Sequence, residues 1–75
     1  MNVDKVLDVK GLACPMPIVK TRKAMKELES DQILEVQTTD KGAKSDLTAW
    51  VKSTGHKMLQ SKEEHDVFTF WIKKG

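Results

Sequence analysis

Two prolines beside the only cysteine of this chain fix where a helix can begin. The segment is Cys14-Pro15-Met16-Pro17, and residues with helical spacing follow it. Proline suits the first turn of a helix, because its ring fixes φ at a helical value and its missing N–H would have no intrahelical acceptor there. The motif therefore predicts a helix that starts at Pro15, with Cys14 at the N-cap or just before it.

This position predicts a reactive thiol. The amides of Met16 and Ile18 are expected to point past the cysteine, and the helix dipole places partial positive charge there. Both effects favour a thiolate, so we expect Cys14 to be partly exposed, with a pKa below the usual value of about 8.5. The alternative is a buried structural thiol, since unpaired cysteines are often buried. A core cysteine would not need two prolines that fix a helix end beside it, and we favour the reactive thiol.

Hydrophobic periodicity predicts the order β-α-β-α-β-β. Apolar stripes at helical spacing occupy residues 15–28 and 43–54, and Gly55 suits a left-handed C-cap after the second helix. Strands are predicted at residues 3–9, 33–38, 56–62 and 67–73, with a hairpin turn at residues 63–66.

The strand pattern also predicts the layers. A sheet whose strands are apolar on one face only needs helices packed against that face alone. Helical crossovers favour parallel neighbours, whereas the final hairpin must be antiparallel. The predicted fold class is therefore α/β, a two-layer sandwich with two helices on one face of a four-stranded mixed sheet.

Size and composition favour a single soluble domain. The chain has 75 residues, which leaves no room for a second core, so residues 1–75 are predicted to form one domain. Thirteen basic and eleven acidic residues give a net charge of +2, which is weak support for a polyanionic partner. One cysteine cannot form an internal disulfide, and neither a secretory signal nor a membrane-spanning run is present. We therefore expect a reduced, cytoplasmic protein without a membrane partner.

No second catalytic group or metal site can be identified with Cys14. A cysteine hydrolase needs a histidine base, but His56 and His65 lie far downstream and cannot be placed beside the thiol. One cysteine and two unspaced histidines match no ligand pattern, so no metal and no cofactor are predicted. Asp40 and Asp46 flank the start of the second helix, where we expect both to act as capping residues.

The two tryptophans are predicted to lie in different environments. Trp50 belongs to the apolar stripe of the second helix and should pack in the core. Trp71 alternates away from Phe70 and Ile72, so it should lie on the open face of the sheet or at its edge. An exposed tryptophan there is a candidate for an interface.

Short motifs along the whole chain resemble those of the TusA/SirA-like sulfur-carrier family. They are Leu7-Asp8, Gly11-Leu12, Cys14-Pro15-Met16-Pro17, Thr39-Asp40, Asp46-Leu47 and Gly55-His56. The resemblance implies the same two-layer fold and a motif cysteine, here Cys14, that carries sulfur as a persulfide. It implies a sulfur-donor protein, such as a cysteine desulfurase or a rhodanese-like protein, and a sulfur-acceptor protein. Lys41 stands where many members have proline, at the start of the second helix.

Two functions remain to be distinguished. The first is a sulfur carrier or sulfurtransferase acting through Cys14, with Lys10, Lys20 and Lys44 as candidate docking residues. It needs one protein thiol, whereas a disulfide oxidoreductase normally has a second, resolving cysteine. The alternative is a nonenzymatic RNA-binding module, since the family's topology resembles the C-terminal domain of the third bacterial translation initiation factor. The chain has no GxxG clamp, no tyrosine and no spaced aromatic pair, so nucleic acid is the less favoured partner.

Overall fold

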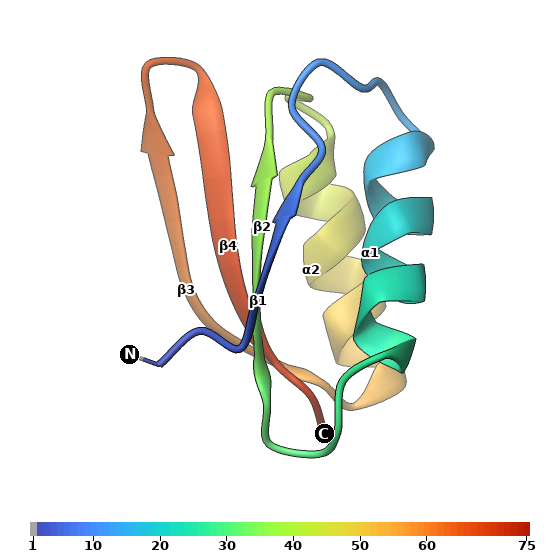
Figure 1. Ribbon diagram of the computed structural model, residues 1–75. Helices are drawn as coiled ribbons and strands as arrows, with labels where there is room; N and C mark the ends of the chain where they lie inside the picture. Colours follow the sequence, from blue (N-terminus) through green and yellow to red (C-terminus); the bar gives the residue numbers. More distant parts are fainter. Residues whose placement is uncertain (1) are drawn as a thin grey trace.

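Two helices cover one face of a four-stranded sheet (Figure 1). The computed structural model describes residues 2–75. The elements in chain order are β1 Lys5–Asp8, α1 Met16–Lys26, β2 Ile33–Thr38, α2 Ala43–Thr54, β3 Lys57–Glu64 and β4 Val67–Lys73. This order and these layers confirm the predicted two-layer α/β fold.

The sheet is mixed and has the strand order β1-β2-β4-β3. β1 and β2 are parallel, and β4 is antiparallel to both β2 and β3. The crossover through α2 therefore joins two strands, β2 and β3, that are separated by β4. Because β1 and β2 run in the same direction, α1 and α2 both begin at the same end of the sheet, the upper end in Figure 1. This arrangement brings two chain segments that are distant in sequence to one place.

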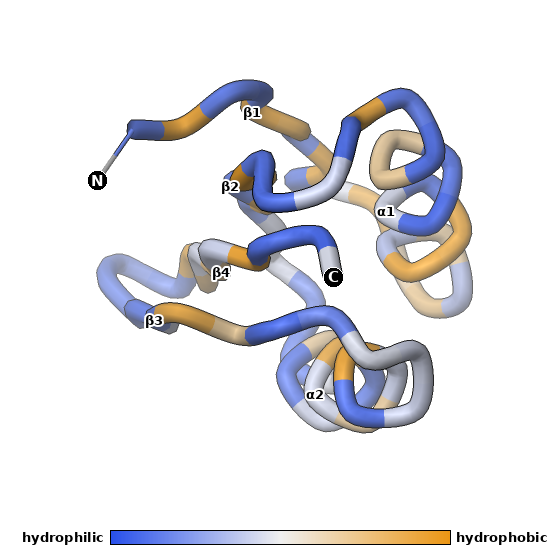
Figure 2. The backbone as a smooth tube through the Cα atoms, turned by 90° about the horizontal axis from the view of Figure 1, so that it is seen from below, coloured by the Kyte–Doolittle hydropathy of each residue, from blue (hydrophilic) through white to orange (hydrophobic). Residues whose placement is uncertain are grey.

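The core lies between the helices and the covered face of the sheet. Every second residue of the central strands points into it, including Leu34, Val36, Phe70 and Ile72, which are at most 1% exposed. Both helices supply the other side of the core, with Met25 from α1 among its largest buried side chains. The view from below in Figure 2 shows the helices on one side of the strands, α1 nearer β1 and β2 and α2 nearer β3. The period-two and helical patterns of the sequence thus converge on one core.

Three elements differ in extent from the sequence prediction, namely α1, β1 and β3. Helix α1 has Pro15 as its N-cap and is already capped at Glu27, although Leu28 is still buried. Strand β1 is shorter than predicted, because its register with β2 runs only from Lys5 to Asp8 and single backbone hydrogen bonds flank it at Asp4 and Val9. The predicted four-residue turn at 63–66 is wrong. Its first two residues pair with β4, and only His65 and Asp66, both with positive φ, make the turn.

Gly55 ends α2 in the left-handed conformation predicted for it. Its φ is +83° and its amide donates to the carbonyl of Val51. A β-carbon at this position would meet no atom within 4 Å, so the cost of substitution is conformational. We expect Gly55→Ala to lower the free energy of unfolding by about 1 kcal/mol, measured by urea denaturation. Gly55→Asn should lose less of this free energy, because asparagine tolerates the left-handed backbone conformation. Equal stability of both variants and the wild type would show that this conformation does not require glycine.

Candidate functional site

Cys14 lies exposed in the loop between β1 and α1, one residue before the N-cap Pro15. The Cys14–Pro15 peptide bond is cis, and the helix begins at Met16. Pro17 occupies the first turn of α1 and is buried. The structure thus confirms an exposed cysteine directly before a helix, with both prolines at the helix start, and excludes the buried structural thiol.

The loop that carries Cys14 is tied to the turn after β2. The amide of Val9 donates to the carbonyl of Gln37 at 2.8 Å, which extends the parallel pairing by one residue. The amide of Gly11 then donates to Oγ1 of Thr39 at 2.9 Å. Gly11 has a φ of +83°, a conformation that glycine adopts without strain. These bonds hold the start of α1 next to the start of α2.

The nearest polar partner of the thiol comes from α2. Sγ of Cys14 donates to Oδ2 of Asp46 at 3.5 Å, and Asp46 lies in the first turn of α2, partly buried. The two residues line one small depression together with Pro17 and Asp40. Oδ1 of Asp40 accepts the amide of Gly42 at 3.2 Å, while its buried Oδ2 has no hydrogen-bond partner within residues 2–75. The sulfur therefore faces two carboxylates.

These carboxylates make the prediction of a lowered thiol pKa wrong. The hydrogen bond to Asp46 stabilises the protonated thiol and raises the pKa of Cys14, followed by smaller contributions from desolvation and from the charges of Asp46 and Asp40. The stabilisation of a thiolate that we expected from the amide of Met16 is also reduced, because this amide donates to the carbonyl of Ala13 at 3.0 Å. The arrangement therefore favours the protonated form of the Cys14 thiol, with the carboxylate of Asp46 beside it.

The capping role predicted for the two aspartates is wrong for both in its strict sense, because the N-cap of α2 is Gly42 and no side chain caps the helix. Asp40 closes the turn before α2, since its side chain accepts the amide of Gly42 and its carbonyl accepts the amide of Ala43. Asp46 makes no cap and binds the thiol instead. Sequence reasoning missed this partner, although a usable signal existed. Two parallel strands followed by helices place both helix starts at one end of the sheet.

The three candidate docking lysines are not gathered around the thiol. Lys10 follows β1, and its Nζ lies 3.8 Å from Oδ2 of Asp8. Lys20 lies on α1 and lines a depression beside β1. Lys44 lies on α2 and faces the strands of the β3–β4 hairpin. Cys14 also lines an open groove along the two helices, together with Ile18 and Trp50. None of the three lysines lines this groove or the small depression with Asp40 and Asp46.

The aromatic side chains occupy the predicted regions, and the histidines lie away from the thiol depressions. Trp50 is partly buried and packs against the core, as predicted. Trp71 lies on the uncovered sheet face, where its Nε1 donates to Oε1 of Glu35 at 2.9 Å. His65 is part of the β3–β4 turn, while His56 follows α2 and contacts Trp50. Neither histidine lines a depression with Cys14.

Within residues 2–75, no group of three His, Cys, Asp or Glu side chains is arranged to hold a metal ion. No helix among these residues is long and apolar enough to cross a membrane.

Comparisons with known proteins agree with the fold and show the family. The model of the family described as Sulfurtransferase TusA matches residues 5–74. The chain is 69% identical to "Putative sulfur carrier protein YrkI" of Bacillus subtilis, over the full length of both chains. It is 44% identical to the sulfur carrier protein TusA of Allochromatium vinosum, over 97% of this chain and 96% of that protein. A crystal structure of a SirA-like protein from Desulfitobacterium hafniense shares the fold, with a TM-score of 0.84, coverage of 95% and 97% of the two chains, and 23% identity.

Proposed function

The chain belongs to the TusA family of sulfur carriers, and from this premise we propose that Cys14 carries sulfane sulfur as a persulfide and delivers it to a partner protein. The observation that carries the proposal is the exposed thiol of Cys14, hydrogen-bonded to Asp46 at the end of the sheet where both helices begin. An exposed thiol there can approach a second protein, and one thiol is sufficient for accepting and releasing sulfur.

The loading step exchanges a sulfane sulfur between two thiols. The sulfur of Cys14 loses its proton and attacks the outer sulfur of the donor persulfide, R–S–SH. A new S–S bond forms on Cys14, the S–S bond of the donor breaks, and the donor leaves as a thiolate that takes up the proton. The products are Cys14–S–SH and R–SH, so no external oxidant or reductant is needed. Delivery repeats the exchange with an acceptor thiolate.

Asp46 is the residue placed to handle the proton of this exchange. Its Oδ2 already accepts the S–H hydrogen of Cys14, so it can take the proton as the sulfur attacks. The same carboxylate keeps the unloaded thiol protonated, since it raises the pKa of Cys14. A protonated thiol reacts slowly with oxidants and alkylating compounds. The site thus favours a cysteine that becomes reactive when a donor is bound.

The surface around Cys14 offers contacts for a donor and an acceptor. Met16 of the motif is 40% exposed and Val19, one helical turn later, is 44% exposed. Both lie on α1 close in sequence to the thiol, with Lys20 next to Val19. We assign the apolar contacts of docking to Met16 and Val19, and we place Lys10, Lys20 and Lys44 at the margins of the docking surface, because none of them lines a depression with Cys14. The proposed donor is a cysteine desulfurase or a rhodanese-like protein, and the proposed compartment is the reducing cytoplasm.

The proposal is tested by the mass of the intact protein after exposure to a persulfide donor. We expect a gain of one sulfur atom that dithiothreitol removes, because a reducing thiol attacks the terminal sulfur. Absence of this gain with several donors, including a cysteine desulfurase supplied with cysteine, would contradict the persulfide on Cys14. A retention assay on RNA at increasing salt tests the alternative of an RNA-binding module.

Pro17 is expected to matter more for sulfur transfer than for stability. Its ring is buried in the first turn of α1 and lines the depression beneath the thiol. Pro17→Ala removes the ring and frees φ at this position, so the loop bearing Cys14 should sample more orientations. We expect the transfer rate to fall several-fold, measured by mass-resolved loading, with a much smaller change in thermal midpoint. An unchanged transfer rate would show that Pro17 is only structural.

A further inference from the structure

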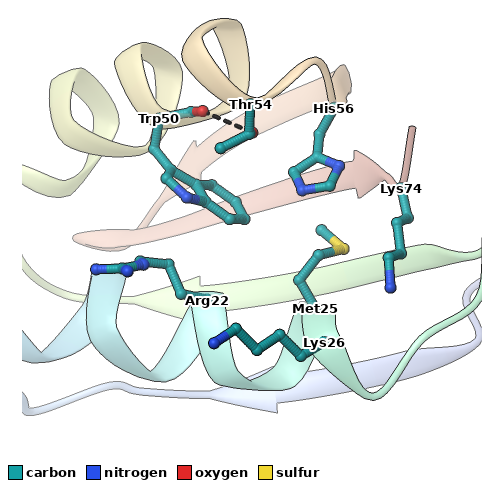
Figure 3. A pocket seen from close by; sticks show the side chains of 7 residues that line it. All are labelled: Arg22, Met25, Lys26, Trp50, Thr54, His56 and Lys74. Carbon is teal, nitrogen blue, oxygen red and sulfur yellow. Dashed lines mark hydrogen bonds between the residues drawn. The ribbon is translucent and has the colours of Figure 1, made fainter.

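A second concave site, shown in Figure 3, lies between the C-terminal halves of the helices and is lined by neither Cys14 nor Asp46. It has a volume of about 350 Å³. Helix α1 contributes Arg22, Met25 and Lys26, the α2 side contributes Trp50 and His56, and Lys74 follows β4. Its size falls within the range of small-molecule sites, which is roughly 300–1,000 Å³.

The charged groups of this pocket are all cations. Arg22, Lys26 and Lys74 line it, and no carboxylate does. Across the described part of the chain, ion pairs involve other basic residues, and none of these three lies within 4.0 Å of a carboxylate. The ammonium group of Lys74 donates to the carbonyl of Leu28, which holds it at the pocket edge. Three cations without acidic partners on one concavity attract an anion.

The walls of the pocket are aromatic and apolar. The rings of Trp50 and His56 lie with centroids 5.1 Å apart and planes inclined by 52°. Figure 3 shows the indole reaching from α2 toward α1, while the imidazole lies above the Met25 side chain. Met25 is 2% exposed and belongs to the core. A flat ring can stack on such a surface, because tryptophan offers a large, partly buried π-face.

His56 contributes a second ring to the wall of the pocket, next to Trp50. Its Nδ1 accepts the amide of Gly75 at 3.0 Å. Burial lowers the pKa of His56, and the charge of Lys74 lowers it further. The lowered pKa favours the neutral imidazole, so the charge of the pocket comes from Arg22, Lys26 and Lys74.

From these observations we propose that the pocket binds a mononucleotide-sized anion that carries a planar ring and a phosphate. The ring lies against Trp50, and the phosphate lies on Arg22, Lys26 and Lys74. Trp50 also lines the open groove that contains Cys14, so the two sites are neighbours along the helices. The binding does not use the thiol, and the proposal is independent of the persulfide on Cys14.

The experiment titrates the protein with adenosine monophosphate, and separately with adenosine and inorganic phosphate. Trp71→Phe removes the other tryptophan, which lies on the opposite face of the sheet, so that fluorescence reports Trp50 alone. We expect saturable binding of the nucleotide, about tenfold tighter than either part, because ring and phosphate contacts are linked in one molecule. Nucleotide binding no tighter than phosphate or adenosine would overturn the proposal.

Variants locate the site. Arg22→Gln and Lys26→Gln should each weaken nucleotide binding several-fold, since each removes a charge from the pocket. Lys20→Gln, on the same helix but outside the pocket, should leave the affinity unchanged, and so should Cys14→Ser. Equal losses in Lys20→Gln and Arg22→Gln would overturn the assignment. Tight binding of a short single-stranded RNA without binding of the mononucleotide would also overturn it.

Discussion

Cys14→Ser will abolish sulfur loading and leave the fold intact. The side chain is exposed and its one polar contact is the hydrogen bond to Asp46, which a serine hydroxyl can also donate. Serine is similar in size and the exposed Cys14 side chain makes no helix cap, so we expect a thermal midpoint within about 4 °C of the wild type. A hydroxyl cannot hold a stable persulfide. Intact mass after incubation with a persulfide donor should therefore show one added sulfur atom on the wild type and none on the variant.

The wild type alkylated beforehand with iodoacetamide serves as a second control. It keeps the sequence but blocks the only thiol of the chain, so it should also fail to load. Equal loading of the wild type and Cys14→Ser would place the sulfur elsewhere and remove the proposed role. If the nucleotide pocket fails its own test while loading depends on Cys14, the persulfide proposal stands unaffected, because the two readouts use different residues.

The fold was accessible from the sequence because local patterns and burial agree. Leu34 and Val36 alternate with polar residues along β2, and both are fully buried. Gly55 ends α2 at the predicted position with the expected left-handed φ. The element that was least well predicted is β3, most of whose residues are exposed. An edge strand of this kind is defined by its pairing with β4, which no local pattern of β3 contains.

The site was accessible in part, for a related reason. Cys14 and the prolines form a contiguous motif, so a local argument found the exposed thiol before a helix. Its partner Asp46 is 32 residues away and comes close only through the parallel pairing of β1 and β2. A local argument about the α1 dipole therefore predicted the wrong direction of the thiol pKa. The cationic pocket was missed too, because its residues come from two helices and the segment after β4.

Asp46→Asn will make the thiol of Cys14 more reactive at neutral pH. The hydrogen bond to the carboxylate stabilises the protonated thiol, and the negative charge opposes the thiolate. Asparagine keeps the shape and removes the charge, so the pKa of Cys14 should fall and the thiolate fraction at pH 7 should rise. We expect alkylation by iodoacetamide to be several-fold faster than in the wild type, followed by intact mass over time.

The pH dependence and two matched variants show whether Asp46 is the cause. Below the pKa of both thiols, the ratio of the alkylation rate of Asp46→Asn to that of the wild type should be constant and above one. Above both pKa values it should fall to one or slightly below, because each thiol is then fully ionised and the thiolate of lower pKa is the weaker nucleophile. Asp40→Asn should give a smaller increase, since Asp40 acts on the thiol by charge alone, and the distant Asp66→Asn should give none. Equal rates for Asp46→Asn and the wild type at pH 7 would show that this carboxylate does not control the thiol.

The rate of sulfur loading tests the second role of Asp46, as the proton acceptor. If Asp46 accepts the proton during attack, the loading rate of Asp46→Asn at pH 7 should rise by a smaller factor than its alkylation rate, because the thiols that are still protonated have no carboxylate beside them to take the proton.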